Sequence, residues 1–300
     1  MKILMPVDGS RCSKAAVAFV ASRSGMFGAT PEVELLNVQP LIPPRAVIIA
    51  GASEVHAYRG ARFDAVLKPA LTRLRRAGIA AQTRRLLGDP ARTVGAVAEA
   101  TDADLIAIGS HGPTVLRRLL FGSVTSAVLA RSRRPVLVLR GTAARKRKSL
   151  AVGVAIDGSR YSMAAVRHLL RHAALLRTAS RIVLIHVVPD LASLVLPGLG
   201  NAPAPLYSPR TILEAQEAGF ESVMAPARRL FEAAGFQVES CRRTASSPGD
   251  EIAKFAVRHR LDLLVMGTHG QGALKSMLLG SVAMRVAARC TIPLLLVPAR

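Results

Sequence analysis

Two stretches of the sequence decide the fold: Asp8-Gly-Ser-Arg-Cys-Ser-Lys-Ala-Ala-Val17 and Asp157-Gly-Ser-Arg-Tyr-Ser-Met-Ala-Ala-Val166. Eight of their ten positions are identical. The chain repeats itself again further on, where residues 104–112 match 262–270 and residues 120–124 match 278–282. A repeat of about 150 residues has the length of a domain and is far longer than a solenoid unit. The chain of 300 residues is therefore predicted to contain one domain twice.

The spacing of the matches sets the domain boundaries. The two copies are offset by 149 residues at the first match and by 158 at the later ones, so the second copy holds additional residues. We expect these in the proline-rich stretch from Pro189 to Pro209, which has the composition of a loop. Apolar periodicity stops at Gly141–Lys148, whose four cations are typical of a solvated tether. The predicted domains are residues 1–142 and 149–300.

The composition limits the class of protein. Lys and Arg number 41 against 19 Asp and Glu, which gives a formal charge of +22, while 50% of the residues are hydrophobic. A disordered basic tail is excluded, because such a segment lacks the apolar residues for a core. Arginine supplies 34 of the 41 cations in an alanine-rich chain, which favours coding bias over nucleic-acid binding as the source of the charge. Three cysteines without metal-type spacing, and no apolar run of membrane length, indicate a reduced, cytoplasmic protein.

Short apolar runs alternate with longer helical patterns within each copy. In the first copy, strands are expected at 2–7, 32–38, 81–87, 104–109 and 135–140, and helices at 13–24, 55–77, 90–101 and 123–132. Leu105–Ile108 and Val136–Leu139 are apolar at every position, which is typical of parallel strands covered by helices on both faces. The pattern predicts an α/β fold with two tandem, doubly wound domains, each built on a five-stranded parallel sheet.

A spacing of glycines follows the fourth expected strand of each copy. It is Gly109-x2-Gly112-x9-Gly122-Ser123 in the first copy and Gly267-x2-Gly270-x9-Gly280-Ser281 in the second. In a doubly wound sheet, ligands bind beyond the carboxyl ends of the strands. The first two glycines allow sharp turns and the close approach of a ligand. The Gly-Ser pair opens a helix, whose unpaired N–H groups and positive end favour phosphate.

Each first strand ends at an acid, Asp8 or Asp157. Asp-Gly-Ser is a common turn and Asp a common helix cap, so one interpretation is structural. In a phosphate site, the same carboxylate would hold a ribose hydroxyl or a divalent cation. His111 and His269 lie inside the glycine loops, where a solvated or backbone-bonded histidine is more common than a catalytic one. No residue is therefore assigned a catalytic role.

Gly-x2-Gly-x9-Gly-Ser after a fourth strand, together with Val7-Asp-Gly-Ser10 after the first, resembles the universal stress protein family in its ATP-binding branch. The resemblance covers Lys2–Arg140 and Leu150–Pro298, so the chain looks like a tandem member. It implies Rossmann-like domains, similar to the adenine nucleotide α-hydrolases. It also implies a site for ATP, accompanied by Mg²⁺ or Mn²⁺, in each domain.

The resemblance assigns roles to individual residues. It places Asp8 and Asp157 near the ribose and the metal, and Val38 and Val187 beside the adenine. The implied phosphate loops are Gly109, Gly112, Gly122 and Ser123 in the first copy and Gly267, Gly270, Gly280 and Ser281 in the second, and the next residues of the helix, Val124, Thr125 and Val282, are implied to lie close to the nucleotide. The second copy has Ala283 in place of Thr125, and Ser246-Ser247-Pro248 in place of Gly88-Asp89-Pro90.

The last strand of each copy, at 135–140 or 293–298, is an apolar sheet edge that needs covering. Members of the family dimerise through this edge, which implies that the two halves pair with each other as an internal pseudo-dimer. A homodimer of whole chains is compatible with the sequence as well.

The expected function is an ATP-binding stress-response or signalling module with an unknown protein partner. An ATP-using enzyme is the alternative, but a Gly-x4-Gly-Lys-Ser/Thr loop and a kinase-type His-Arg-Asp sequence are both absent, so at most slow ATP hydrolysis is expected. A charge-driven, non-specific nucleic-acid binder is a third alternative, which lacks aromatic platforms and a helix-turn-helix signature. Neither a membrane nor a specific nucleic acid is expected as a partner.

Overall fold

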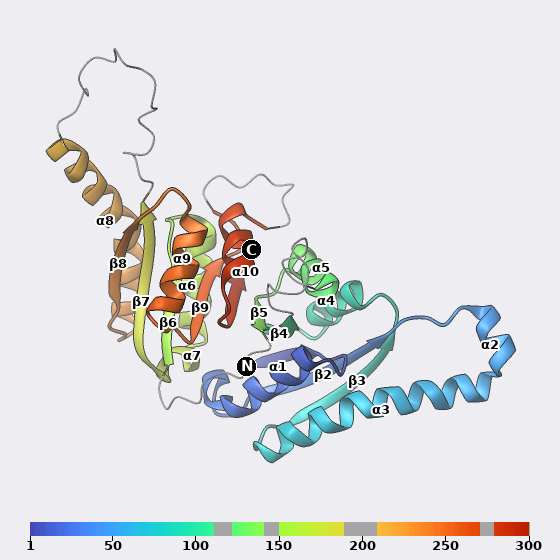
Figure 1. Cartoon of the computed structure of the whole chain (residues 1–300). Coiled ribbons are helices and arrows are strands. Elements are labelled where there is room, and N and C mark those ends of the chain that lie inside the picture. The colour runs from blue at the N-terminus through green and yellow to red at the C-terminus, as the bar shows by residue number, and fades with distance from the viewer. Residues whose placement is uncertain (111–121, 141–149, 189–208, 271–278, 300) are drawn as a thin grey trace, which may run out of the picture.

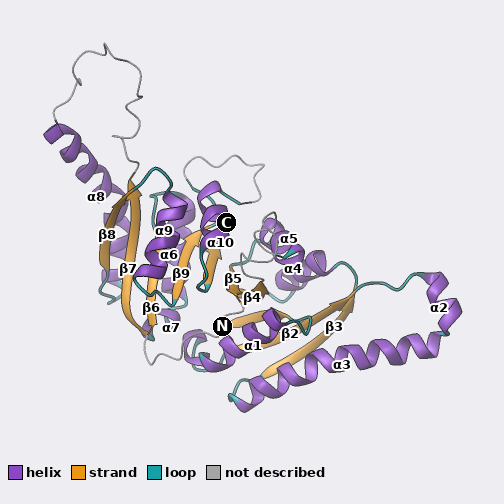
Figure 2. Cartoon of the chain, in the orientation of Figure 1, coloured by secondary structure: helices purple, strands orange, loops and turns teal. Residues whose placement is uncertain are grey.

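The computed structural model describes residues 1–110, 122–140, 150–188, 209–270 and 279–299. Strands and helices alternate along both halves of the chain, and helices pack on each side of the strands (Figure 1, Figure 2). Among the described residues, none of the helices has the length and apolar character needed to cross a membrane. The α/β class that the sequence predicts is confirmed.

The first half contains the elements that the periodicity predicts, together with a short 3-10 turn and one additional α-helix. Its strands agree with the expected ranges to within about two residues, the usual uncertainty of element ends. The additional helix is α2, in which Pro44 occupies the first turn, where proline is tolerated. The elements are β1 (Lys2–Pro6), α1 (Arg11–Ser22), the 3-10 turn η1 (Ser24–Phe27), β2 (Glu32–Gln39), α2 (Pro44–Ala50), α3 (Ala52–Arg76), β3 (Ala81–Leu87), α4 (Pro90–Ala100), β4 (Leu105–Ser110), α5 (Ser123–Arg131) and β5 (Val136–Arg140).

The second half repeats the order of the strands, with α7 in the place of η1 and, among the described residues, one helix, α8, in the place of α2 and α3. Its elements are β6 (Leu150–Ala155), α6 (Arg160–Arg171), α7 (Ala174–Arg177), β7 (Ala179–Val188), α8 (Pro209–Ala233), β8 (Glu239–Thr244), α9 (Pro248–Arg258), β9 (Leu263–Gly267), α10 (Ser281–Arg289) and β10 (Leu294–Val297). The repeated Asp-Gly-Ser stretch forms the same strand-to-helix turn in both halves. The hydroxyl of Ser10 accepts a hydrogen bond from the Ser13 amide, and Ser159 caps Ser162 in the same way, both at 3.2 Å. The glycine before each capping serine has a φ of 79° or 77°, a conformation that favours glycine.

The strands form one ten-stranded sheet in the order β3-β2-β1-β4-β5-β10-β9-β6-β7-β8. All pairs within a half are parallel. At the centre, β5 and β10 pair in the antiparallel direction, with Leu295 opposite Leu137. This pairing confirms the internal pseudo-dimer, because the last strand of each half covers the apolar edge of the other.

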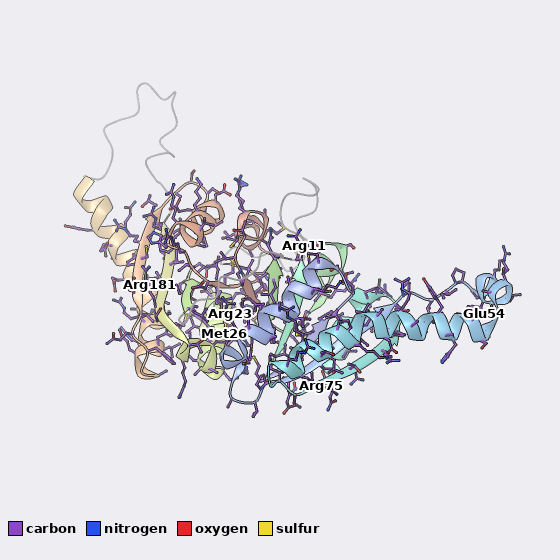
Figure 3. All side chains as sticks on the ribbon, turned by 60° about the horizontal axis from the view of Figure 1, so that its bottom comes forward. Arg11, Arg23, Met26, Glu54, Arg75 and Arg181 are labelled. Atoms are coloured by element: carbon purple, nitrogen blue, oxygen red, sulfur yellow. The ribbon has the colours of Figure 1, made fainter. Side chains whose placement is uncertain are left out.

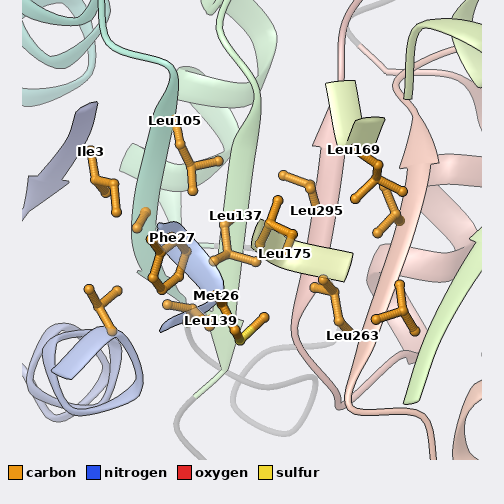
Figure 4. Packing of buried hydrophobic residues seen from close by; sticks show 14 of the residues in the cluster. Ile3, Met26, Phe27, Leu105, Leu137, Leu139, Leu169, Leu175, Leu263 and Leu295 are labelled. Atoms are coloured by element: carbon orange, nitrogen blue, oxygen red, sulfur yellow. The ribbon is translucent and has the colours of Figure 1, made fainter. Parts of the chain in front are cut away.

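Each face of the sheet carries one hydrophobic core that continues through both halves. On one face, buried residues come from α1, α3, α6 and α8; on the other, they come from α4, α5, α9 and α10. Figure 4 shows the first core where the halves meet: Leu137 of β5 and Leu295 of β10 lie near Leu175 of α7, with Met26 and Phe27 of η1 close by. The two halves therefore share their cores and behave as one packed body.

Two polar contacts cross between the halves at equivalent positions. The Asp104 carboxylate accepts a hydrogen bond from the Lys2 amide at 2.8 Å and lies 3.8 Å from Nε2 of His172. Burial lowers the pKa of His172 more than Asp104 raises it, so this imidazole is neutral at pH 7. In the other half, Asp262 attracts the guanidinium of Arg23, which is charged at every pH of interest. One of the two contacts is therefore sensitive to pH and the other is not.

Candidate functional site

In each half, the winding of the sheet reverses between two neighbouring strands. β1 lies between β2 and β4, and β6 lies between β7 and β9. The crevice beyond the carboxyl ends of such strands is where ligands bind in sheets of this kind. Asp8 follows β1 and Asp157 follows β6, so each carboxylate lies at this crevice.

A cavity of about 250 Å³ occupies the crevice of the second half. It is bounded by the turn after β6, the ends of β7 and β9, and the first turn of α10. All of the residues predicted for the second site line this cavity: Asp157, Val187, Gly267, Gly270, Gly280, Ser281 and Val282. The fold thus brings together side chains and backbone that are widely separated in the sequence.

The cavity also has an apolar wall that the sequence reasoning missed. Ala155, Ile252 and Met266 line it, and each is at least nine-tenths buried. The available signal was proximity in the sequence: Met266 directly precedes a site glycine, and Ala155 lies two residues before Asp157. Such a wall suits a flat, apolar ring, because ligand sites of this kind are mostly apolar with a few polar groups that set the orientation.

The glycines of the spacing have different roles. A Cβ on Gly267 would lie 2.7 Å from the backbone of Tyr161, and a Cβ on Gly109 would collide with the backbone of Cys12. These two glycines allow the fourth strand of each half to pack closely against the first helix. In contrast, a Cβ on Gly270 would lie 2.8 Å from Oδ2 of Asp157, within the cavity wall itself. Gly270 therefore preserves the space beside the carboxylate.

Both strand-ending acids are held by their own turn. The Ser159 amide donates to Oδ1 of Asp157 at 3.0 Å, and the Ser10 amide donates to Oδ1 of Asp8 at 2.9 Å. Partial desolvation by itself would raise the pKa of Asp8, but hydrogen bonds from Ser10 and Ser13 outweigh it and hold the pKa below its ordinary value. The Asp8 side chain is therefore a carboxylate at neutral pH.

The amino end of α10 faces the same cavity. Gly280 is its N-cap, and no side chain in the described part of the chain caps the helix there. Ser281 and Val282 of the first turn line the cavity, so the amides that a helix leaves unpaired are near the ligand space. His269 lines the cavity as well: its Nδ1 lies 3.0 Å from the Thr268 hydroxyl, and its ring centroid lies 5.0 Å from that of Tyr161.

The first half places its predicted residues in equivalent elements. Asp8 follows β1, Val38 lies in β2 and Gly109 in β4, while Gly122 caps α5 and is followed by Ser123, Val124 and Thr125. The Thr125 side chain is buried, and its hydroxyl donates to the Gly109 carbonyl at 3.5 Å, so the fold itself uses this group. Gly112 and His111 lie outside the described residues.

A polar residue on the second strand of each half fixes the end of the first strand. The Asn37 amide donates to the Val7 carbonyl at 2.5 Å, and Nδ1 of His186 lies 2.7 Å from the Ile156 carbonyl. Both carbonyls precede the strand-ending acids. The sequence reasoning missed this pair, although the offset of 149 residues between Asn37 and His186 was a signal for it.

No preformed metal centre of three or more His, Cys, Asp or Glu side chains exists among the described residues. Asp157 is the carboxylate that lines the described cavity, so it is the side chain that could serve as a protein ligand to a divalent cation there, with the rest of the oxygen shell coming from a bound ligand and water. Such shared coordination is the usual mode for Mg²⁺.

Comparison with known proteins identifies the relatives of the chain. The model of the universal stress protein family matches residues 1–140 and 150–298. A universal stress protein of Mycolicibacterium smegmatis is 28% identical over 306 residues, covering 99% of this chain and 97% of the relative. A universal stress protein of Methanocaldococcus jannaschii is 31% identical over 140 residues, covering 46% of this chain and 81% of the relative.

Among solved structures, the crystal structure of a universal stress protein from Archaeoglobus fulgidus superposes with a TM-score of 0.71. The match covers 100% of this chain and 98% of the other at 21% identity. At this identity the likeness concerns the fold, which in both proteins extends over the full length.

Proposed function

The chain belongs to the universal stress protein family, and from this membership we propose that it is a nucleotide-binding module that holds ATP, with Mg²⁺ or Mn²⁺, in the crevice of each half. The observation that carries the proposal is the cavity of the second half, which all seven predicted residues line. We place the two binding units at residues 1–142 and 149–300. In the cytoplasm, nucleotide occupancy would change which protein partner binds to the pair.

The cavity of the second half offers separate regions that suit the adenine, the ribose and the phosphates of ATP. The apolar wall of Ile252 and Met266 suits the adenine, and the backbone of Val187 at the end of β7 supplies hydrogen bonds at its edge. The first turn of α10 suits the phosphates, because unpaired amides and the positive helix end attract anions. Asp157 lies between these regions, where a ribose hydroxyl or a phosphate-bound cation would meet it.

The chemistry of the lining favours binding over turnover. Asp157, His186 and His269 are the titratable residues that line the described cavity, and lysine and arginine are not among its lining residues. Nδ1 of His186 is already engaged with the Ile156 carbonyl. Efficient phosphoryl transfer requires cations on the phosphates and a positioned base, so we expect at most slow hydrolysis.

The first test counts the nucleotide that the protein retains. Purified protein is denatured, and the supernatant is separated by chromatography and quantified against the chain. Two ATP per chain would support two working sites, and one would support a single working site, which the variant of the second half described next would assign. The absence of retained nucleotide, combined with no calorimetric signal for added ATP and Mg²⁺, would overturn the proposal.

The second test compares two glycine-to-alanine variants. Gly270→Ala places a Cβ beside the Asp157 carboxylate, so we expect ATP affinity at the second site to fall at least about tenfold. Gly219→Ala in α8 is the matched control, because no atom lies within 4 Å of its new Cβ. Equal affinity in the two variants would argue against binding at this cavity.

The third test concerns the charge at the crevice. Asp157→Asn keeps the size of the side chain and an oxygen for the Ser159 amide, but it removes the negative charge. We expect the variant to lose most of the gain in ATP affinity that Mg²⁺ provides, while binding of ATP without the metal changes less. An unchanged Mg²⁺ dependence would exclude Asp157 as the metal ligand.

A further inference from the structure

Helices α2 and α3 of the first half form an arm that projects beyond the outer edge of the sheet. In Figure 1 the arm extends past β3, with α2 at its far end. Figure 3 shows the direction of α3, which runs from Glu54 at the far end back to Arg75 beside the sheet. The arm is thus anchored at one end and exposed to solvent at the other.

The far end of this arm is apolar and uncovered. We define the arm tip as Ile48, Ile49 and Tyr58, whose exposed fractions are 81%, 86% and 56%. Val55, by contrast, is buried within the arm. The two adjacent isoleucines are the most exposed large apolar side chains in the described part of the chain. Leaving such side chains in water is unfavourable by about 1.5 kcal/mol or more for each, so the tip has reason to be covered.

Cations outnumber acids along the stretch of chain that forms the outer part of the arm. Residues 41–62 contain three arginines, Arg45, Arg59 and Arg62, against one acid, Glu54. Arg62 donates to the Tyr58 hydroxyl at 3.2 Å and lies 5.7 Å from the centroid of its ring. A partner that matches the arm tip would offer apolar groups to the isoleucines and anionic groups to the arginines.

We propose that the arm tip docks onto an anionic lipid surface, a partner that the sequence by itself did not lead us to expect. The two isoleucines enter the boundary between headgroups and acyl chains, as the apolar faces of interfacial helices do. Along α3 the rise is about 1.5 Å per residue, so Arg59 and Arg62 lie about 10 and 15 Å from Ala52, at the level of the headgroups. There they attract anionic lipids, as cations beside a membrane generally do.

Other occupants fit the tip less well. A second copy of the chain carries the same charge of +22, which opposes self-association. A nucleic acid would match the arginines but would leave the isoleucines in water, because phosphate contacts bury little apolar surface. A protein partner would need a deep pocket to bury the side chains of the projecting arm tip. A lipid surface can bury them without a preformed pocket.

The test uses a fluorescent reporter in the whole chain. The sequence contains no tryptophan, so Tyr58→Trp introduces a single probe at the arm tip. Sonicated vesicles of phosphatidylcholine, with or without about one third phosphatidylserine, are then added. We expect a blue shift of the emission and co-sedimentation with the anionic vesicles only, both weakened by added salt.

Two further variants assign the binding to the tip. Ile48→Asp combined with Ile49→Asp should weaken vesicle binding at least about tenfold, since two apolar anchors are replaced by charges. Val257→Asp is the matched control, because Val257 is also exposed, at 52%, but lies in α9 of the second half. Binding that survives in the double variant, or no blue shift in the reporter, would overturn the proposal. A wild-type dimer that the double variant abolishes would instead assign the tip to a second copy and also overturn it.

Discussion

The seam between the halves provides the sharpest test of the fold. Leu295 of β10 is 1% exposed and lies opposite Leu137 of β5, which is 2% exposed. Truncation of a buried leucine to alanine costs about 2.7 to 5.0 kcal/mol, and more where the surroundings cannot collapse. Strands on both sides hold β10 in place, so we expect Leu295→Ala to lower the free energy of unfolding by about 3 to 5 kcal/mol.

The assay is urea denaturation followed by far-ultraviolet circular dichroism. The wild type should unfold in one transition because both cores continue through the two halves. Leu295→Ala should shift the midpoint of that transition without changing its slope. Leu41→Ala is the control, because Leu41 is 70% exposed and its truncation should change stability by less than about 0.5 kcal/mol. Two separate transitions in the wild type, or a loss below about 1 kcal/mol for Leu295→Ala, would refute a shared core.

Two other predictions concern stability. The pKa of His172 is below its ordinary value, so the unfolded chain binds a proton that the folded chain does not, and the free energy of unfolding should fall as the pH drops below about 6.5. In acid titrations monitored by urea unfolding, His172→Gln should flatten this dependence, and an unchanged slope would contradict it. Gly109→Ala should destabilise by about 1 to 3 kcal/mol or more through its collision with the Cys12 backbone, whereas Gly95→Ala, with no atom within 4 Å of the new Cβ, should be neutral or slightly stabilising. Thermal unfolding of both variants checks this, and equal midpoints would refute it.

The fold could be predicted because its signals are local and occur twice. Buried parallel strands contain runs such as Leu105–Ile108 that are apolar on both faces, so their positions can be read from the sequence. The pairing of β5 with β10 followed from the apolar edges together with the family resemblance. Helix α2 was missed, because it begins directly after a proline, at Pro44, and its exposed isoleucines show none of the amphipathic pattern that packing against the core would impose.

The sequence could predict only those parts of the candidate site that lie at the ends of strands. Asp157 and Gly267 end neighbouring strands, which guarantees that they meet. The role of Gly267, however, depends on Tyr161, and the direction of the Thr125 hydroxyl depends on Gly109. Such contacts depend on the distance between a helix and the neighbouring strand. The spacing of residues in a single sequence does not reveal that distance.

The outer edges of the sheet explain part of the charge. β3 and β8 end the sheet, and each carries a pair of arginines at equivalent positions, Arg84-Arg85 and Arg242-Arg243. These arginines pair with nearby acids, for example Arg84 with Glu34 at 2.6 Å and Arg242 with Glu217 at 2.6 Å. Charged edge strands resist pairing with another chain, whereas the uncharged, apolar parts of β5 and β10 pair readily. The arginines therefore favour pairing of the halves through β5 and β10, and they disfavour the addition of a further strand at β3 or β8.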